Sequence, residues 1–158
     1  MSSDRSETVA IPEAVAEIWR GTRAAWDSIA PYDGDRFRVM TDIIDAAYAV
    51  PVLRQLHVST SHFTLQFSTC LEHPWSDDIP AIEPRQFNSR ADRPPGPGYL
   101  VRNRPRGKVI GEADDAASAI TLLLAHLPPN VGPAGDCHHP GRPRKYSGYE
   151  WWQPRAGS

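Results

Sequence analysis

Residues 107–129 read GKVIGEADDAASAITLLLAHLPP, and this stretch predicts a strand, a turn and an amphipathic helix in succession. Residues 108–111 form a short apolar run that ends in a glycine. Acidic residues follow, and carboxylates favour a helix start because they interact with its unpaired N–H groups. The helix is therefore expected to begin near Asp114 or Asp115. Its apolar residues recur on one face until two prolines end it, and they are Ala116, Ile120, Leu123, Leu124 and Leu127.

The acidic turn before this helix is not interpreted as a phosphate-binding loop. The glycine spacing of such loops is absent, and carboxylates repel an anion. We therefore interpret the turn as a helix cap.

Two further helices are predicted near the N-terminus. Residues 12–29 carry apolar side chains at steps of three and four, and Trp19 and Trp26 lie on that stripe, which is typical of core positions. A turn at residues 33–35 separates this helix from a second one, whose apolar face includes Phe37, Met40 and Ile44. Pro51 is expected to end or kink the second helix.

The strands of the chain follow these helices. Residues 61–69, SHFTLQFST, alternate apolar and polar side chains, which predicts one strand with a buried face and a polar face in an antiparallel sheet. A second strand is expected over residues 79–87, interrupted or at an edge because of Pro80 and Pro84. Two more, at residues 99–102 and 108–111, are joined by NRPRG and can form a hairpin.

This order of elements predicts an α+β domain. Two N-terminal helices, a three- or four-stranded, mainly antiparallel sheet and one C-terminal helix are followed by an irregular tail rich in Pro, Gly and Arg. We expect a flexible lead at residues 1–10, a single domain at residues 11–130 and the tail at residues 131–158. Trp151 and Trp152 are expected to dock the tail on the domain, since apolar rings gain from burial; the alternative is that they bind a partner.

Composition restricts the classes of function. The chain has 158 residues and a net charge of −2, so nucleic-acid binding is not expected from its overall charge. No apolar run reaches the ~18 residues of a membrane span, and MSSDRSETVA lacks the features of a signal peptide. We expect a soluble cytoplasmic protein that has no membrane partner and whose two cysteines are reduced.

One candidate for catalysis is an acid–base pair. His62 lies on the polar face of the predicted strand, and Asp77 and Asp78 lie in the next turn, so the three could meet if the loop folds back. No sequence motif of a serine or cysteine nucleophile occurs in the chain. The alternative is that His62 is simply solvated on the sheet surface.

A basic stretch is the candidate for binding. Arginines gather between residues 85 and 108, while residues 71–83 carry four acidic residues and no Lys or Arg. The basic stretch could bind phosphate or an acidic protein surface, and its alternative role is to protect a sheet edge by its charge. The candidate binding residues are Trp75, Tyr99, Arg102, Arg104 and Arg106.

The cysteines and histidines are candidate metal ligands. Cys137, His138 and His139 are consecutive, and Cys70 and His73 have the spacing C-x-x-H, so together they could supply sulfur and nitrogen ligands for zinc. Neither spacing belongs to a recognised zinc motif. We therefore predict neither a metal nor another cofactor.

Three segments together resemble a small bacterial family of unknown function that is labelled as natural product biosynthesis protein. They are VPVLRQLHVSTSHFTLQFSTC at residues 50–70, HPWSDDIPAIEP at residues 73–84, and GYLVRNRPRGKVIGEADDAASAITLLLAHLPPNVGPA at residues 98–134. The resemblance implies a role in specialised-metabolite pathways and assigns no catalytic residue.

Three hypotheses about function follow from these observations. The first is an accessory protein of such a pathway that binds a protein, peptide or carrier-bound partner. The second is a small pathway enzyme that uses a His/Asp or Cys/His site. The third, by analogy of fold alone, is an immunity or antitoxin-like inhibitor protein.

Overall fold

The computed structural model describes residues 11–29, 34–71, 75–87, 96–135 and 137. Its helical elements are α1 (Ile11–Asp27), the 3-10 helix η2 (Gly34–Phe37), α3 (Arg38–Tyr48), α4 (Pro51–Arg54), the 3-10 helix η3 (Arg85–Phe87) and α5 (Ala116–Ala125). Its strands are β1 (His57–Ser61), β2 (Thr64–Ser68), β3 (Ala81–Pro84), β4 (Tyr99–Arg102) and β5 (Val109–Ala113). The predicted α+β class is confirmed.

The sheet has five strands in the order β1-β2-β3-β4-β5, each antiparallel to its neighbours, which is one more strand than the upper bound of the prediction. The additional strand is β1. The sequence pattern predicts residues 61–69 as one strand, but His62 and Phe63 form a two-residue turn with φ values of 49° and 64°. The sequence does not signal this turn because positive φ at both positions normally requires Gly, Asn or Asp.

The helix break predicted at Pro51 is confirmed. Helix α3 ends at Tyr48, Val50 before the proline is extended with φ −97° and ψ 117°, and Pro51 begins the short helix α4. The strand predicted over residues 79–87 is limited to β3, after which η3 turns the chain away. The hairpin between residues 99 and 111 is confirmed as β4 and β5.

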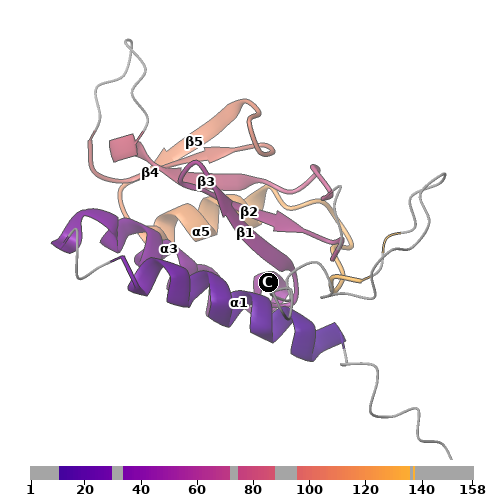
Figure 1. Ribbon diagram of the computed structural model, residues 1–158. Coiled ribbons are helices and arrows are strands. Elements are labelled where there is room, and N and C mark those ends of the chain that lie inside the picture. The colour runs from indigo at the N-terminus through magenta and orange to yellow at the C-terminus, as the bar shows by residue number, and fades with distance from the viewer. Residues whose placement is uncertain (1–10, 30–33, 72–74, 88–95, 136, 138–158) are drawn as a thin grey trace, which may run out of the picture.

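Helices α1, α3 and α5 pack against one face of the sheet (Figure 1). The side chains that meet them are apolar and almost wholly buried, and they include Val58, Leu65, Phe67, Ile82 and Val101. Burial of each such side chain contributes about 1.5–3 kcal/mol. The alternation predicted for β2 is therefore correct, and the opposite face carries Ser59, Gln66, Glu83 and Arg102.

Two tryptophans attach α1 to β1. Trp19 is 2% exposed, and its Nε1–H donates to the carbonyl of Leu56 at 3.0 Å. Trp26, two turns later, donates to the hydroxyl of Thr60 at 3.3 Å. Their predicted core role is thus combined with a polar contact from each indole, and α1 lies along the first strand of the sheet.

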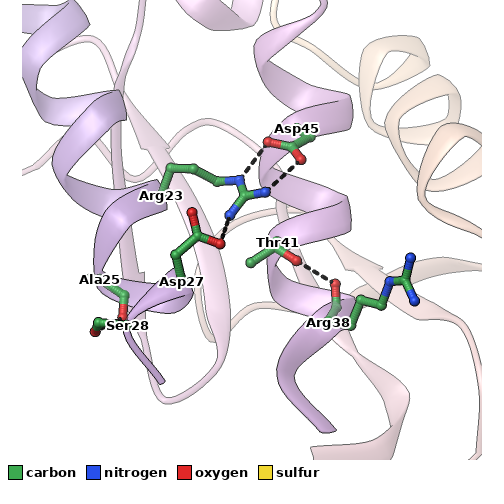
Figure 2. A network of polar contacts seen from close by, with 7 residues as sticks. All are labelled: Arg23, Ala25, Asp27, Ser28, Arg38, Thr41 and Asp45. Atoms are coloured by element: carbon green, nitrogen blue, oxygen red, sulfur yellow. Dashed lines mark hydrogen bonds and ion pairs between the residues drawn. The ribbon is translucent and has the colours of Figure 1, made fainter. Parts of the chain in front are cut away.

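A charged contact joins α1 to α3, as Figure 2 shows. The guanidinium of Arg23 donates from Nε and Nη2 to the two carboxylate oxygens of Asp45, at 2.7 and 3.1 Å, and its Nη1 contacts Asp27. The hydrogen bond with Asp45 raises the pKa of Arg23. This two-point geometry fixes the relative position of the two helices better than a single ion pair would.

The predicted cap of the last helix is confirmed. The carboxylate of Asp115 accepts a hydrogen bond of 2.7 Å from the backbone N–H of Ser118, and this bond lowers the pKa of Asp115. Gly111 in the preceding strand packs closely against this helix, since a Cβ there would lie 2.6 Å from Leu122 Cδ2 and the leucine side chain would have to move. Ala119, Ile120 and Leu123 of α5 are buried in the core.

Candidate functional site

Antiparallel pairing brings His57, Ser68 and Arg102 to one end of the sheet. His57 of β1 pairs with Ser68 of β2, and Ala81 of β3 pairs with Arg102 of β4. The first residues of β1, β3 and β5 therefore lie beside the last residues of β2 and β4. We call this end of the sheet the Trp75 end, after the ring that packs there.

His57 is the most unusual side chain at the Trp75 end. It is 5% exposed, its ring stacks on that of Trp75 with a centroid distance of 4.2 Å, and its Nδ1 has no hydrogen-bond partner within the described residues. Burial lowers the pKa of His57 to about 4, because the charged imidazolium is poorly solvated there. His57 is consequently neutral near pH 7.

Two serines fix the loop that carries Trp75. The hydroxyl of Ser68 accepts hydrogen bonds from the backbone N–H groups of Cys70 and Ser76, both at 2.9 Å. The hydroxyl of Ser76 in turn accepts from the N–H of Thr69 at 2.8 Å. This network is partly buried, and it positions the loop against the end of β2.

Cys70 and Cys137 form a disulfide, so the expectation of two reduced thiols is wrong for this structure. The residues lie 67 positions apart, and no local pattern predicts that they meet. Backbone hydrogen bonds support the contact, because Leu71 donates to the carbonyl of Gly135 and Gly135 donates to that of Thr69, both at 3.0 Å. The segment expected to begin the tail thus packs on the domain through its first residues.

The disulfide bears directly on the metal candidates. Cys137 is bonded to Cys70, so its sulfur is not a thiolate ligand in this state. His73, His138 and His139 lie outside the described residues, as do Trp151 and Trp152 of the tail. Within the described ranges, no group of three or more His, Cys, Asp or Glu side chains is placed to hold a metal ion.

A buried ion pair crosses the polar face of the sheet. Arg102 is 8% exposed, and its Nε and Nη2 donate to Glu83 Oε1 at 3.0 and 2.7 Å. The hydroxyl of Thr64 donates to the other oxygen of Glu83 at 3.3 Å. Arg102, predicted as a binding residue, is therefore engaged with Glu83 across the polar face of the sheet.

The turn between β4 and β5, residues 103–108, is held by several hydrogen bonds. Asn103 N–H donates to Lys108 O and Lys108 N–H donates to Asn103 Oδ1, both at 2.9 Å, while Arg102 Nη1 donates to Gly107 O at 2.8 Å. A side chain at position 107 would disturb these contacts, since a Cβ there would lie 2.1 Å from Asn103 Oδ1 and 3.0 Å from Arg104 O. We call residues 103–108 the basic hairpin.

The basic hairpin projects three cationic side chains. Arg104, Arg106 and Lys108 are all exposed. Arg104 contacts Asp77 with an N–O distance of 4.0 Å, so the hairpin lies next to the loop that carries Trp75. Of the predicted binding residues, Trp75, Arg102, Arg104 and Arg106 therefore lie at the same end of the sheet.

Tyr99 does not join them. It begins β4 at the opposite end, is 4% exposed, and donates from its hydroxyl to the carbonyl of Val39 at 2.8 Å. Burial raises the pKa of Tyr99 to about 12, with the carboxylates of Asp42 and Asp115 adding to the effect. It is a core residue that fastens the sheet to α3.

The predicted catalytic residues are also divided. His62 is exposed in the turn between β1 and β2, next to an aromatic cluster formed by Trp26, Phe37, Phe63 and Phe87. Asp77 and Asp78 are exposed near the other end of β2, where Ser76 bonds to Ser68. The structure does not bring His62 together with either aspartate.

Sequence reasoning did not identify His57, Ser68 or Ser76. These residues are ordinary polar members of strand or loop segments, and only the pairing of β1 with β2 and the return of the loop place them together. Trp75 within the Pro-Trp-Ser turn is the one local signal of this region. In the part of the chain that the structure describes, no helix is long and apolar enough to cross a membrane.

Comparisons with known proteins give one result. Searches of curated proteins and of solved structures return no significant match. A family model described as "Family of unknown function (DUF6193)" matches residues 13–138, which include nearly all of α1, the whole sheet, α5 and both cysteines. The chain therefore belongs to this family of unknown function.

Proposed function

We propose that the chain is a cytoplasmic accessory protein of bacterial specialised-metabolite biosynthesis, and that it acts by binding an acidic protein or peptide partner, including one that carries a pathway intermediate. The pathway rests on the resemblance of residues 50–134 to the family labelled in that way. The binding role rests on the basic hairpin.

The preorganisation of the basic hairpin is the observation that carries the proposal. Three cations occupy alternate positions from 104 to 108, and the turn that holds them is fixed by backbone and side-chain hydrogen bonds. A partner that binds a rigid loop does not have to order it, so less of the interaction energy is lost on association. Arginine also pairs with carboxylates at two points.

The charges around the hairpin favour a protein partner over a nucleic acid. Asp77 and Asp78 are exposed beside it and would repel a polyanion there, and the net charge of −2 gives the whole chain no overall attraction for one. A partner that presents a small acidic patch would contact the hairpin alone. Such complementarity mainly increases the association rate and the specificity.

The test is a binding measurement with purified proteins. The full chain is titrated calorimetrically with each purified product of the genes that neighbour its own gene. We expect one of them to form a stoichiometric complex that weakens with salt. Arg104→Glu with Arg106→Glu should reduce the affinity about tenfold or more, because two attractive contacts become repulsive.

A matched control keeps the change in net charge constant. Arg20→Glu with Arg36→Glu alters two exposed arginines away from the hairpin and should leave the affinity unchanged. Absence of any complex, or a complex insensitive to the hairpin variant, would refute the proposal. Conversion of a pathway intermediate by the chain alone would support an enzyme instead, and one-to-one neutralisation of a neighbouring toxin would support an immunity protein.

A further inference from the structure

The segment around Ala134 is held to the domain by a small set of backbone hydrogen bonds. Ala134 N–H donates to the carbonyl of Gln55 at 2.9 Å, and two backbone hydrogen bonds join Gly135 to the chain at residues 69 and 71. Ala134 is 2% exposed. These contacts form a short parallel bridge between Gly135 and Cys70, beside the end of β2.

The disulfide adds the covalent part of this attachment. Cys70 is 6% exposed and Cys137 is half-buried, so Cys137 is the more accessible of the two residues. Leu71 and Ala134, which lie on the two sides of this attachment, belong to the hydrophobic core, and Cys70 is buried beside them. Loss of the bond therefore removes the covalent constraint on the C-terminal segment, and release of the segment withdraws only the small side chain of Ala134 from the core.

We propose that the Cys70–Cys137 disulfide is a redox switch that determines whether the segment around residues 134–137 stays fixed on the end of β2. The reductant is a dithiol. Its thiolate attacks Cys137 Sγ, a mixed disulfide forms, and Cys70 leaves as a thiolate that takes up a proton. The second thiol of the reductant then attacks the reductant sulfur that is bonded to Cys137. Cys137 is released as a thiol, and the reductant is oxidised to an internal disulfide.

The switch adjoins the Trp75 end of the sheet. The hydroxyl of Ser68 bonds both the N–H and the carbonyl of Cys70, at 2.9 and 3.1 Å, and it also bonds the N–H of Ser76. Release of the segment would therefore change the contacts of Cys70, which lies next to the loop that carries Trp75. The inference does not depend on the proposed function, because its readout is hydrogen exchange within the chain itself.

The test is amide hydrogen exchange followed by NMR on the full chain, with and without dithiothreitol and over a range of low urea concentrations. In the oxidised protein we expect protection of the three amides that hold the segment, those of Leu71, Ala134 and Gly135. After reduction their exchange should become about tenfold faster or more and nearly independent of urea, since only local opening is then needed. The amides of β4, paired on both sides, should still exchange through global unfolding, with a strong dependence on urea.

A double variant checks that the disulfide itself controls the segment. Cys70→Ser with Cys137→Ser should exchange like the reduced protein and should not respond to dithiothreitol. Free thiols in the purified protein under oxidising conditions, or unchanged exchange of the three amides after reduction, would overturn the inference. The same urea dependence in β4 and in the three amides would also overturn it, because the segment would then be released only when the whole domain unfolds.

Discussion

At the scale of single residues, His57 determines a pH dependence of stability. Its folded-state pKa is about 4, against an ordinary value of 6.5, because burial disfavours the charged ring. Between pH 4 and pH 6.5 the unfolded chain therefore binds more protons at this histidine than the folded chain does. The stability contributed by neutral His57 is complete above pH 6.5 and is lost as the pH falls towards 4, by about 3 kcal/mol in total.

Urea denaturation at pH 7 and pH 4.5 measures this effect. His57→Phe keeps a flat ring against Trp75 and removes the titrating group, so the variant should lose less free energy of unfolding on acidification than the wild type. His62→Gln, in the exposed turn at the other end of β1, is the control and should keep the wild-type loss. Equal losses in His57→Phe and the wild type would contradict the assignment.

At the scale of elements, the contact of Arg23 with Asp45 couples α1 to α3 (Figure 2). The side chain of Arg23 is 32% exposed and that of Asp45 is 57% exposed, so solvent screens their attraction. A double-mutant cycle with Arg23→Ala and Asp45→Ala should give a coupling free energy of about 0.5–1 kcal/mol, and salt should lower it.

The geometry of the Arg23 contact gives a second variant. Arg23→Lys keeps the charge but cannot bond both carboxylate oxygens in the same plane, so it should recover less than half of the coupling. Thermal unfolding of the four proteins of the cycle and of this variant supplies the measurement. Full recovery by lysine would mean that charge alone, without two-point bonding, joins the helices.

At the scale of the whole molecule, the disulfide closes a loop between residues 67 positions apart. A cross-link of that span restricts the unfolded chain, and its removal should lower the free energy of unfolding by about 4 kcal/mol. Urea titrations with and without dithiothreitol measure the difference. The double serine variant should match the reduced wild type, and identical midpoints for oxidised and reduced protein would contradict the prediction.

The candidate site is only partly predictable from the sequence. The basic hairpin and Trp75 are visible there because a run of arginines and a Pro-Trp-Ser turn are local features. The stack of His57 on Trp75 and the pairing of Arg102 with Glu83 are not, since each joins residues from different elements. The fold therefore divides the five predicted binding residues and places Tyr99 in the core.

The sequence by itself determined the α+β class, the three long helices, the Asp115 cap and the two-faced character of β2, because periodicity and capping act within a few residues along the chain. Tertiary structure alone decided the turn at His62 and Phe63, the Cys70–Cys137 bond and the convergence of polar groups at the Trp75 end. Those features depend on contacts between residues that are far apart in the sequence. The packing of the whole domain brings such residues together, and no local stretch of the sequence carries a pattern that predicts the contact.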